Sequence, residues 1–511
     1  MNVDVVLNPT KDLSMFAPEI YLAILGVLVL GVALFAKRKQ PLAAPIVAAL
    51  GLIGGLPVAA SLWGQGTTTI LMGSYAVDDF AVFFKLLAMA TGVLVVFIST
   101  SYMRRVVEEY GEFFALLVWA VLGLCLMAGA SDLIVILLAI EMVSIISYIM
   151  TGFFRDQPRS AEASLKYFLF GAAASAVMIY GMSLLYGVAG TTKLYGVFGG
   201  SEQLAAGLTG NSLLQPLAAL FILVGLGFKI AMAPFHWWAP DAYEGAPTPV
   251  TAFLSVGPKA AGLAVVARLF MTGDNAIYSQ WPLVVAFLAT LTMFMGNWSA
   301  LHQSNIKRML AYSSVAHAGY LLIAVVAWQG ADWHSTGADG AIGTHGGMRA
   351  VMFYLAAYLF MNIGAFAVAI AVEQATGSEA IERFSGLATR SPFLALAMTI
   401  FMLSLAGIPP MAGFVGKFYV FSIAIHNKAF LWLAIVGVIN SVIAVYYYMN
   451  VVRVMYFRPA SDLDTEDVAP KAVAGVQSAI IIALIGTLLL GILPNPLIRF
   501  LSESIFPGGL S

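Results

Sequence analysis

The chain alternates between apolar runs of transmembrane length and short polar segments. About 20 consecutive apolar residues span the hydrocarbon core of a bilayer as an α-helix. On that length the pattern predicts 14 transmembrane helices. Their approximate extents are 18–36, 41–63, 80–102, 113–129, 133–154, 164–189, 216–238, 249–272, 281–301, 309–328, 350–372, 392–425, 429–457 and 474–493. We therefore predict an all-α polytopic membrane protein whose residues 1–511 form a single membrane domain, with a short turn at Gly129–Asp132 dividing the fourth and fifth helices.

Composition agrees with a protein that lies in the lipid bilayer. Of the 511 residues, 61% are hydrophobic and only 10% are charged, and the mean hydropathy is +0.91. Soluble proteins average about 25% charged residues. The net charge of −1 gives no sign of a nucleic-acid partner. The single cysteine, Cys125, excludes a disulfide framework and a cysteine-ligated iron–sulfur cluster in this chain.

The basic residues predict an orientation in the membrane. Loops after odd-numbered helices carry most of the loop lysines and arginines, among them Arg104, Arg155 and Lys307. Lys and Arg are enriched in short cytoplasmic loops. The distribution therefore places these loops in the cytoplasm and both termini outside, in the periplasm.

Two predicted helices contain breaks. Residues 392–425 would measure about 50 Å as one helix, at 1.5 Å per residue, whereas the hydrocarbon core is only about 30 Å thick. Gly407–Pro410 lies in the middle of this run, and proline breaks or kinks a helix. The run 216–238 holds Pro234 shortly after Lys229. Broken helices in both halves of a chain are typical of inverted-repeat transporters and mark their binding sites.

Four charged residues lie inside apolar runs: Glu141, Lys229, Lys259 and Lys417. Each costs about 2.5–3.5 kcal/mol at a helix centre, whereas a leucine returns only about 0.3–0.6 kcal/mol. Burial favours the neutral form of a lysine, and a nearby carboxylate favours the charged form, so such groups can load and release a proton. The pattern indicates a proton relay. The alternative is structural: each lysine pins two helices through a carboxylate, and Glu141 bonds to Ser144 or Tyr148 on its own helix.

Other polar positions are weaker members of the predicted site. Histidine has an unperturbed pKa suited to a relay, and His236 and His317 lie inside predicted helices; the alternative for each is a hydrogen-bonded core histidine. Lys166 follows Glu162 by four residues at a helix start, so it is a tentative relay group or an anchor at the cytoplasmic interface. Lys85 and Arg268 lie near span ends, where long basic side chains reach the interface, and are expected to be anchors.

Five short segments that contain polar residues resemble motifs of one family. They are 162–168, 228–236, 240–247, 305–317 and 407–417, which look like the corresponding segments of the antiporter-like membrane subunits of complex I, the proton-translocating NADH–quinone oxidoreductase. Tyr243, in Pro-Asp-Ala-Tyr-Glu-Gly-Ala-Pro, and Lys417 resemble the N-type subunit. The likeness covers nearly the whole chain.

The resemblance implies 14 helices with two inverted five-helix repeats, at approximately 113–272 and 281–457, flanked by helices at 18–102 and 474–493. It also implies a Glu141–Lys229 pair, Lys259 as the central relay, Lys417 as the outlet-side lysine, and proton translocation driven by quinone reduction elsewhere in the complex.

Partners and cofactors follow from the same resemblance. It implies no cofactor or metal in this chain, and NAD, FMN, iron–sulfur clusters and quinone in partner subunits. The expected neighbours are the antiporter-like subunit M, small membrane subunits and, through them, the peripheral redox arm, in a bacterial inner membrane.

Three other functions compete with this one. A subunit of a multisubunit cation/proton antiporter would share the lysines and the broken helices. A haem-bearing electron carrier would use His236 and His317 as axial ligands but leaves the lysines unexplained. In a plain scaffold the lysines would only pin helices.

Overall fold

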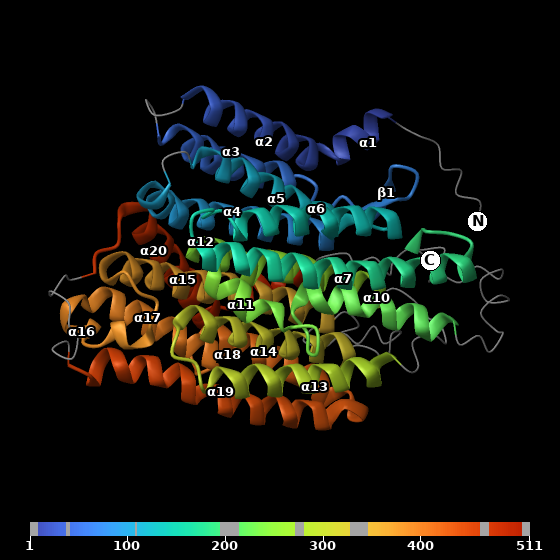
Figure 1. Ribbon diagram of the computed structural model, residues 1–511. Helices are drawn as coiled ribbons and strands as arrows, with labels where there is room; N and C mark the ends of the chain where they lie inside the picture. Colours follow the sequence, from blue (N-terminus) through green and yellow to red (C-terminus); the bar gives the residue numbers. More distant parts are fainter. Residues whose placement is uncertain are drawn as a thin grey trace.

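The computed structural model describes residues 9–36, 41–107, 110–194, 214–270, 281–327, 346–459 and 470–502. This part of the chain is a bundle of long helices that lie side by side (Figure 1). In chain order the elements are α1 (Pro9–Met15), α2 (Ala17–Ala36), α3 (Ala43–Ala60), β1 (Thr68–Ile70), β2 (Tyr75–Val77), α4 (Asp79–Val106), α5 (Gly111–Gly129), α6 (Leu133–Thr151), α7 (Pro158–Ala189), α10 (Leu214–Ile230), α11 (Trp238–Gly245), α12 (Thr248–Phe270), α13 (Trp281–Ala300), α14 (Ile306–Ala327), α15 (Gly346–Thr376), η4 (Ile381–Phe384), α16 (Leu387–Arg390), α17 (Pro392–Ala406), α18 (Ala412–His426), η5 (Lys428–Phe430), α19 (Leu431–Phe457), α20 (Ala474–Ile492) and α21 (Asn495–Ser502).

The predicted helices are confirmed, including the two with breaks. Within the described ranges, 12 helices are long and apolar enough to cross a membrane. The two remaining predicted spans correspond to shorter apolar helices, α10 for the first and α17 with α18 for the second. The division between the fourth and fifth spans is also confirmed, because α5 ends at Gly129 and α6 begins at Leu133. Asp132 caps α6 by accepting a 2.8 Å hydrogen bond from the Ile134 amide.

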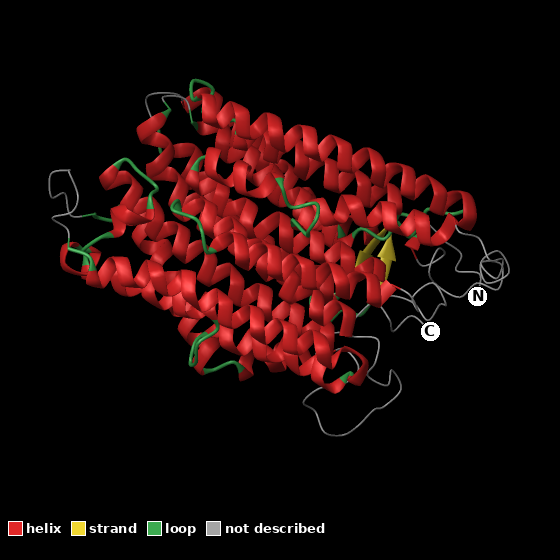
Figure 2. Cartoon of the chain, turned by 60° about the horizontal axis from the view of Figure 1, so that its bottom comes forward, coloured by secondary structure: helices red, strands yellow, loops and turns green. Residues whose placement is uncertain are grey.

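A small hairpin was not expected from the apolar runs. Strands β1 and β2 pair antiparallel, with Thr68 opposite Val77 and Ile70 opposite Tyr75 (yellow in Figure 2). Each strand has only three residues, which is too short for an alternating pattern to show in the sequence.

The core of the bundle consists of α12, α14 and α15, which are buried over almost their whole length. Outer helices instead expose large apolar side chains, such as Ile24 on α2, Leu169 on α7 and Val442 on α19. In a bilayer these outer faces contact lipid. Polar groups on α12 and α14 therefore contact protein rather than hydrocarbon tails.

Both breaks begin at a residue in the left-handed region of backbone space. Helix α10 ends at Ile230 and is followed by Ala231 with a φ of 57°, an uncommon conformation for a residue with a Cβ. Helix α17 ends at Ala406, and Gly407, with a φ of 86°, turns the chain before α18. Glycine adopts this conformation without a steric penalty. Each break leaves helix-terminal backbone groups inside the bundle.

Candidate functional site

At the first break, neighbouring side chains satisfy the exposed backbone groups. The Ala233 amide donates a 3.0 Å hydrogen bond to Oγ1 of Thr292 on α13. The Trp238 indole donates one of 2.9 Å to the Phe228 carbonyl. Buried backbone groups need such partners when a helix stops inside a protein. These contacts fix the last turn of α10, which carries Lys229.

Lys229 donates a 3.0 Å hydrogen bond to Oγ of Ser144 on α6, and its side chain is buried. Its stem packs against α12, because a Cβ at Gly262 would lie 3.4 Å from the lysine Cγ. Lys229 therefore bridges α10, α6 and α12.

Glu141 lies one turn before Ser144 on α6. Its Oε1 accepts a 2.5 Å hydrogen bond from Oγ of Ser175 on α7. Its hydroxyl partner is thus on a neighbouring helix, and not Ser144 or Tyr148 on its own helix. The ion pairs between described residues do not join Glu141 and Lys229; in this structure Lys229 bonds to Ser144 and Glu141 to Ser175.

Lys259 lies on α12, which is buried throughout. Its Nζ donates a 2.6 Å hydrogen bond to Oγ of Ser314 on α14 and lies 5.7 Å from the centre of the Tyr243 ring. Pro258 precedes it inside the helix and removes one backbone donor. Among the described residues this ammonium group contacts a hydroxyl and an aromatic face, and it forms no ion pair with a carboxylate there.

Helix α14 carries a polar row of three residues at one-turn spacing, Ser314, His317 and Tyr320. The His317 ring is bonded on both sides: Nδ1 to the Tyr354 hydroxyl, and Nε2 to the Tyr448 hydroxyl at 3.1 Å. Because both ring nitrogens are engaged, this arrangement does not present His317 as an axial haem ligand. At one end of the row Ser314 bonds to Lys259, and at the other end the Tyr320 ring centre lies 4.8 Å from Nζ of Lys417.

Lys417 lies at the second break. Its Nζ donates to the carbonyls of Leu405 and Ala406, at 3.1 and 2.9 Å, and to Oγ of Ser441 at 2.8 Å. The last carbonyls of a helix have no intrahelical partner and carry the negative end of the helix dipole. The end of α17 therefore offers a favourable site for this buried ammonium group.

Lys166 differs from Lys229, Lys259 and Lys417 in being partly exposed and ion-paired. Lys166 has a side chain 41% exposed and pairs with Glu162 at 2.7 Å and with Asp241 at 3.0 Å. Arg308 also pairs with Asp241, at 2.8 Å, and with Glu244, at 2.7 Å. This group of charges ties the start of α7 to α11 and α14.

His236 lies in the break between α10 and α11. It is buried, and its Nδ1 has no hydrogen-bond partner within the described part of the chain. Its ring centre lies 5.0 Å from that of Trp237.

The expectation that Lys85 and Arg268 reach the membrane interface is wrong. Lys85 is completely buried and pairs with Glu19 at 2.9 Å. Arg268 is 2% exposed and pairs through both terminal nitrogens with Asp78, at 2.9 and 3.0 Å. Both carboxylates come from other parts of the chain, so packing supplies a partner that proximity to a span end does not reveal.

The sequence reading missed the hydroxyl groups that contact the site. They are Ser144 as a lysine partner, Ser175, Ser314 as a lysine partner, Tyr320, Tyr354, Ser441 and Tyr448. The run Tyr446–Tyr448 on α19 is the only visible signal among them, since three tyrosines in an apolar run are unusual.

Comparison with known proteins supplies the family. The family model described as NADH:quinone oxidoreductase/Mrp antiporter, TM, matches residues 130–444. NADH-quinone oxidoreductase subunit N of Trichlorobacter lovleyi is 42% identical over 99% of both chains. The same subunit of Rhodospirillum rubrum is 41% identical over 91% of this chain and 92% of the relative. The chain belongs to the subunit N family of NADH–quinone oxidoreductase.

Solved structures agree with this family. A chain of respiratory complex I from Thermus thermophilus, solved with bound aureothin, is 31% identical, covers 96% of this chain and 100% of that chain, and gives a TM-score of 0.77. A chain of the archaeal membrane-bound sulfane sulfur reductase shares the fold at 23% identity, with a TM-score of 0.80 over 96% of both chains. The family confirms the expected membrane subunit of a proton-translocating complex, which has the other subunits of that complex as partners.

Proposed function

We propose that the chain carries protons through Glu141, Lys229, Lys259, His317 and Lys417, with quinone reduction elsewhere in the complex as the driving event. The observation that carries this proposal is shared by the three lysines. Each is buried and donates to a serine hydroxyl on a neighbouring helix: Ser144, Ser314 and Ser441 respectively. A hydroxyl both donates and accepts, so it can stay bonded to a lysine in its charged and its neutral form.

The polar row on α14 supports a continuous route. Ser314 bonds to Lys259, His317 follows one turn later, and the Tyr320 ring lies beside Lys417. Tyr448 extends the row by bonding to His317 and, at 2.5 Å, to Ser313. We keep His236 as a tentative relay group near the first break. Lys166 is assigned to the ion-pair group at the end of the bundle.

The wider setting is also a proposal. NAD, FMN, iron–sulfur clusters and quinone would bind to partner subunits, and subunit M and small membrane subunits would be the direct neighbours. The chain would lie in a bacterial inner membrane, with the two repeats at 113–272 and 281–457. The distribution of basic loop residues and an even number of crossings favour periplasmic termini. The terminal residues 1–8 and 503–511 lie outside the described ranges.

Substitutions of Lys259 distinguish a proton relay from a scaffold in which the lysine has only a structural role. Lys259→Arg keeps a charge and a long stem, but arginine stays protonated in proteins. Lys259→Met removes the charge and keeps much of the volume. The relay requires both variants to lose proton uptake in reconstituted vesicles while a native gel shows an assembled complex. Normal uptake with arginine would mean that Lys259 only has to carry charge.

Orientation is tested by cysteine labelling in a Cys125→Ala background. Two exposed residues serve as labelling positions. Gln65 lies between α3 and β1, and Arg155 follows α6. An impermeant thiol reagent added to intact cells should label Gln65→Cys and leave Arg155→Cys unlabelled. Labelling of position 155 would reverse the orientation.

A further inference from the structure

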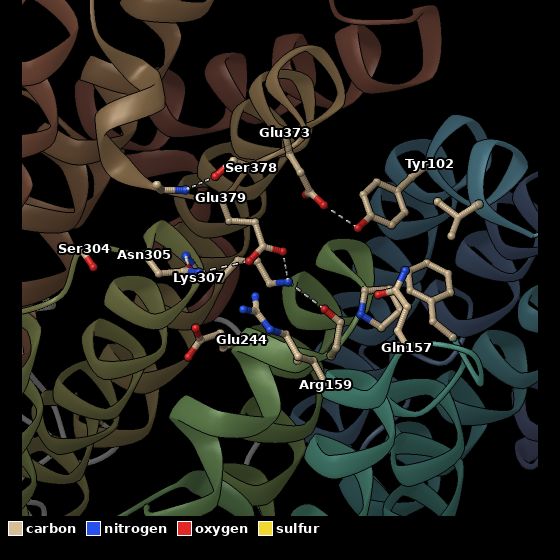
Figure 3. A pocket seen from close by; sticks show the side chains of 17 residues that line it. Tyr102, Gln157, Arg159, Glu244, Ser304, Asn305, Lys307, Glu373, Ser378 and Glu379 are labelled. Carbon is tan, nitrogen blue, oxygen red and sulfur yellow. Dashed lines mark hydrogen bonds and ion pairs between the residues drawn. The ribbon is translucent and has the colours of Figure 1, made fainter. Parts of the chain in front are cut away.

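A polar pocket lies at one end of the bundle, and Lys229, Lys259 and Lys417 are not among its lining residues. Its volume is about 510 Å³, and Glu244, Lys307, Glu373 and Glu379 supply its charged walls together with Arg159 (Figure 3). Every wall segment lies at or just after the C-terminal end of an odd-numbered helix of the sequence prediction. The pocket therefore lies on the side that the basic residues assign to the cytoplasm, from which a redox-driven pump takes its protons.

Glu373 differs from the other carboxylates of the pocket. Glu379 pairs with Lys307 at 2.6 Å. Glu373 instead accepts hydrogen bonds from two hydroxyls, that of Tyr102 at 2.7 Å and that of Thr248 at 2.6 Å. Within the described part of the chain no cation lies within ion-pair distance of Glu373. It is a pocket carboxylate without a fixed counter-charge, and it contacts α12 directly.

Thr248 is the first residue of α12 and begins a row of hydroxyls that leads to Lys259. The row continues with Thr251 and Ser255, and all three side chains are completely buried. The spacings of three, four and four residues keep one face of a helix and rise by about 4.5–6 Å each. Thr251 and Ser255 each donate to a backbone carbonyl, at 2.8 and 2.7 Å, so each hydroxyl has to rotate to pass a proton along the row. The whole row covers about 16 Å of helix.

Unpartnered polar groups surround the inner end of this row. Asn362 on α15 donates a 2.6 Å hydrogen bond to Oγ of Ser255, while its own Oδ1 has no partner among the described residues. The hydroxyls of Tyr243, whose ring faces Lys259, and Tyr358, whose ring centre is 5.0 Å from that of His317, also lack partners there. Buried polar atoms of this kind are ordinarily satisfied by ordered water.

We propose that the pocket is the mouth of a proton uptake path, in which Glu373 collects protons and passes them along Thr248, Thr251 and Ser255 to Lys259. No bond other than those to hydrogen changes. A proton enters on Glu373, and each hydroxyl or water accepts one proton and releases another until Lys259 is protonated. This path rests on the proposed relay, because it supplies the lysine at the centre of that relay.

Glu373→Gln is the first test. The amide oxygen accepts from one of the two hydroxyls of Tyr102 and Thr248 and the amide NH2 donates to the other, but the side chain no longer takes up a proton. Proton uptake by the reconstituted complex should fall severalfold. Formate, a soluble proton carrier small enough for the pocket, should restore part of the lost rate without changing wild-type uptake. The matched control is Glu382→Gln, on the same side of the bundle and 77% exposed, which should pump normally.

Rescue by formate separates the two explanations of a defective Glu373→Gln variant. A merely structural carboxylate would not be replaced by a soluble acid. Normal uptake without formate, or a loss that formate does not relieve, would overturn the assignment of Glu373.

Removal of the hydroxyl row is the second test. The double variant Thr251→Val with Ser255→Ala should slow proton uptake severalfold in an assembled complex. Thr399→Val is the control, because Thr399 bonds to its own helix at Ala395 and lies on α17, outside the path. If the double variant pumps normally while Lys259→Met does not, the relay stands and the uptake path is wrong. If Lys259→Met also pumps normally, the relay itself fails.

Discussion

Nζ of Lys259 on α12 and Oγ of Ser314 on α14 lie 2.6 Å apart, and both side chains are buried. The pair joins the two helices that are most completely enclosed by protein. A buried ammonium group without a carboxylate at contact distance is costly, and a single hydroxyl only partly offsets the lost hydration. A group that must change protonation during turnover benefits from such a setting, because neither form is held too strongly.

Ser314→Ala should lower proton uptake while Ser314→Thr should retain most of it. Alanine leaves Lys259 without its hydroxyl partner, whereas threonine keeps the hydroxyl at the cost of one added methyl group. General acid–base partners typically contribute about 10²–10⁴-fold to a proton transfer, so a loss of at least tenfold is expected for alanine. Uptake and quinone reductase activity should be measured together. Equal losses in both variants would point to packing rather than to the hydroxyl.

Glu141→Gln and Lys229→Arg should both impair pumping. Glutamine keeps an acceptor for Ser175 but removes the exchangeable charge. Arginine keeps the charge near Ser144 but does not release its proton. If pumping and electron transfer are tightly coupled, quinone reduction falls in parallel. Full pumping by the arginine variant would assign Lys229 a structural charge only.

Substitutions of Lys417 distinguish a proton-relay role from a purely structural role at the second break. Lys417→Arg keeps a cation beside the Leu405 and Ala406 carbonyls, and Lys417→Ala removes it. We expect both variants to pump poorly in an assembled complex. If Lys417 has only a structural role, the arginine variant should pump normally. The alanine variant should then fail to assemble, as judged on a native gel.

Gly413→Ala should destabilise the second break. A Cβ at position 413 would overlap the Ser404 carbonyl oxygen, so α17 and α18 would have to separate. Overpacking of this kind costs about 1–3 kcal/mol. Gly187→Ala on α7 is the control, since nothing lies within 4 Å of its added Cβ. The thermal midpoint of the purified complex should fall for position 413 and stay constant for position 187.

Lys85→Met should destabilise the chain more than the double variant Lys85→Met with Glu19→Gln. The single change leaves the Glu19 carboxylate buried without a cation, and breaking a buried pair in this way costs about 3–5 kcal/mol. The double change removes both charges. Thermal unfolding of the two variants measures the difference. A double variant as unstable as the single one would show that the pair also supports packing through Tyr75, whose hydroxyl bonds to Glu19.

The helices and the charged members of the site are predictable from the amino-acid sequence. A bilayer requires about 20 apolar residues for each crossing, so length alone reveals most spans. The breaks were visible because Pro234 and Pro410 interrupt apolar runs. Lys229, Lys259 and Lys417 stood out because a charge in an apolar run is expensive enough to require a reason.

The groups that these charges contact follow from the packing of the helices and are not predictable from the sequence. Ser144, Ser314 and Ser441 lie 85, 55 and 24 residues from their lysines. A serine in a helix can bond to a carbonyl of the preceding turn, so it is inexpensive in an apolar run and leaves no periodic signal. The burial of Lys85 and Arg268 was hidden for a related reason. Whether a basic side chain near a span end reaches water or a carboxylate depends on which helix packs against it, and this information is absent from local sequence.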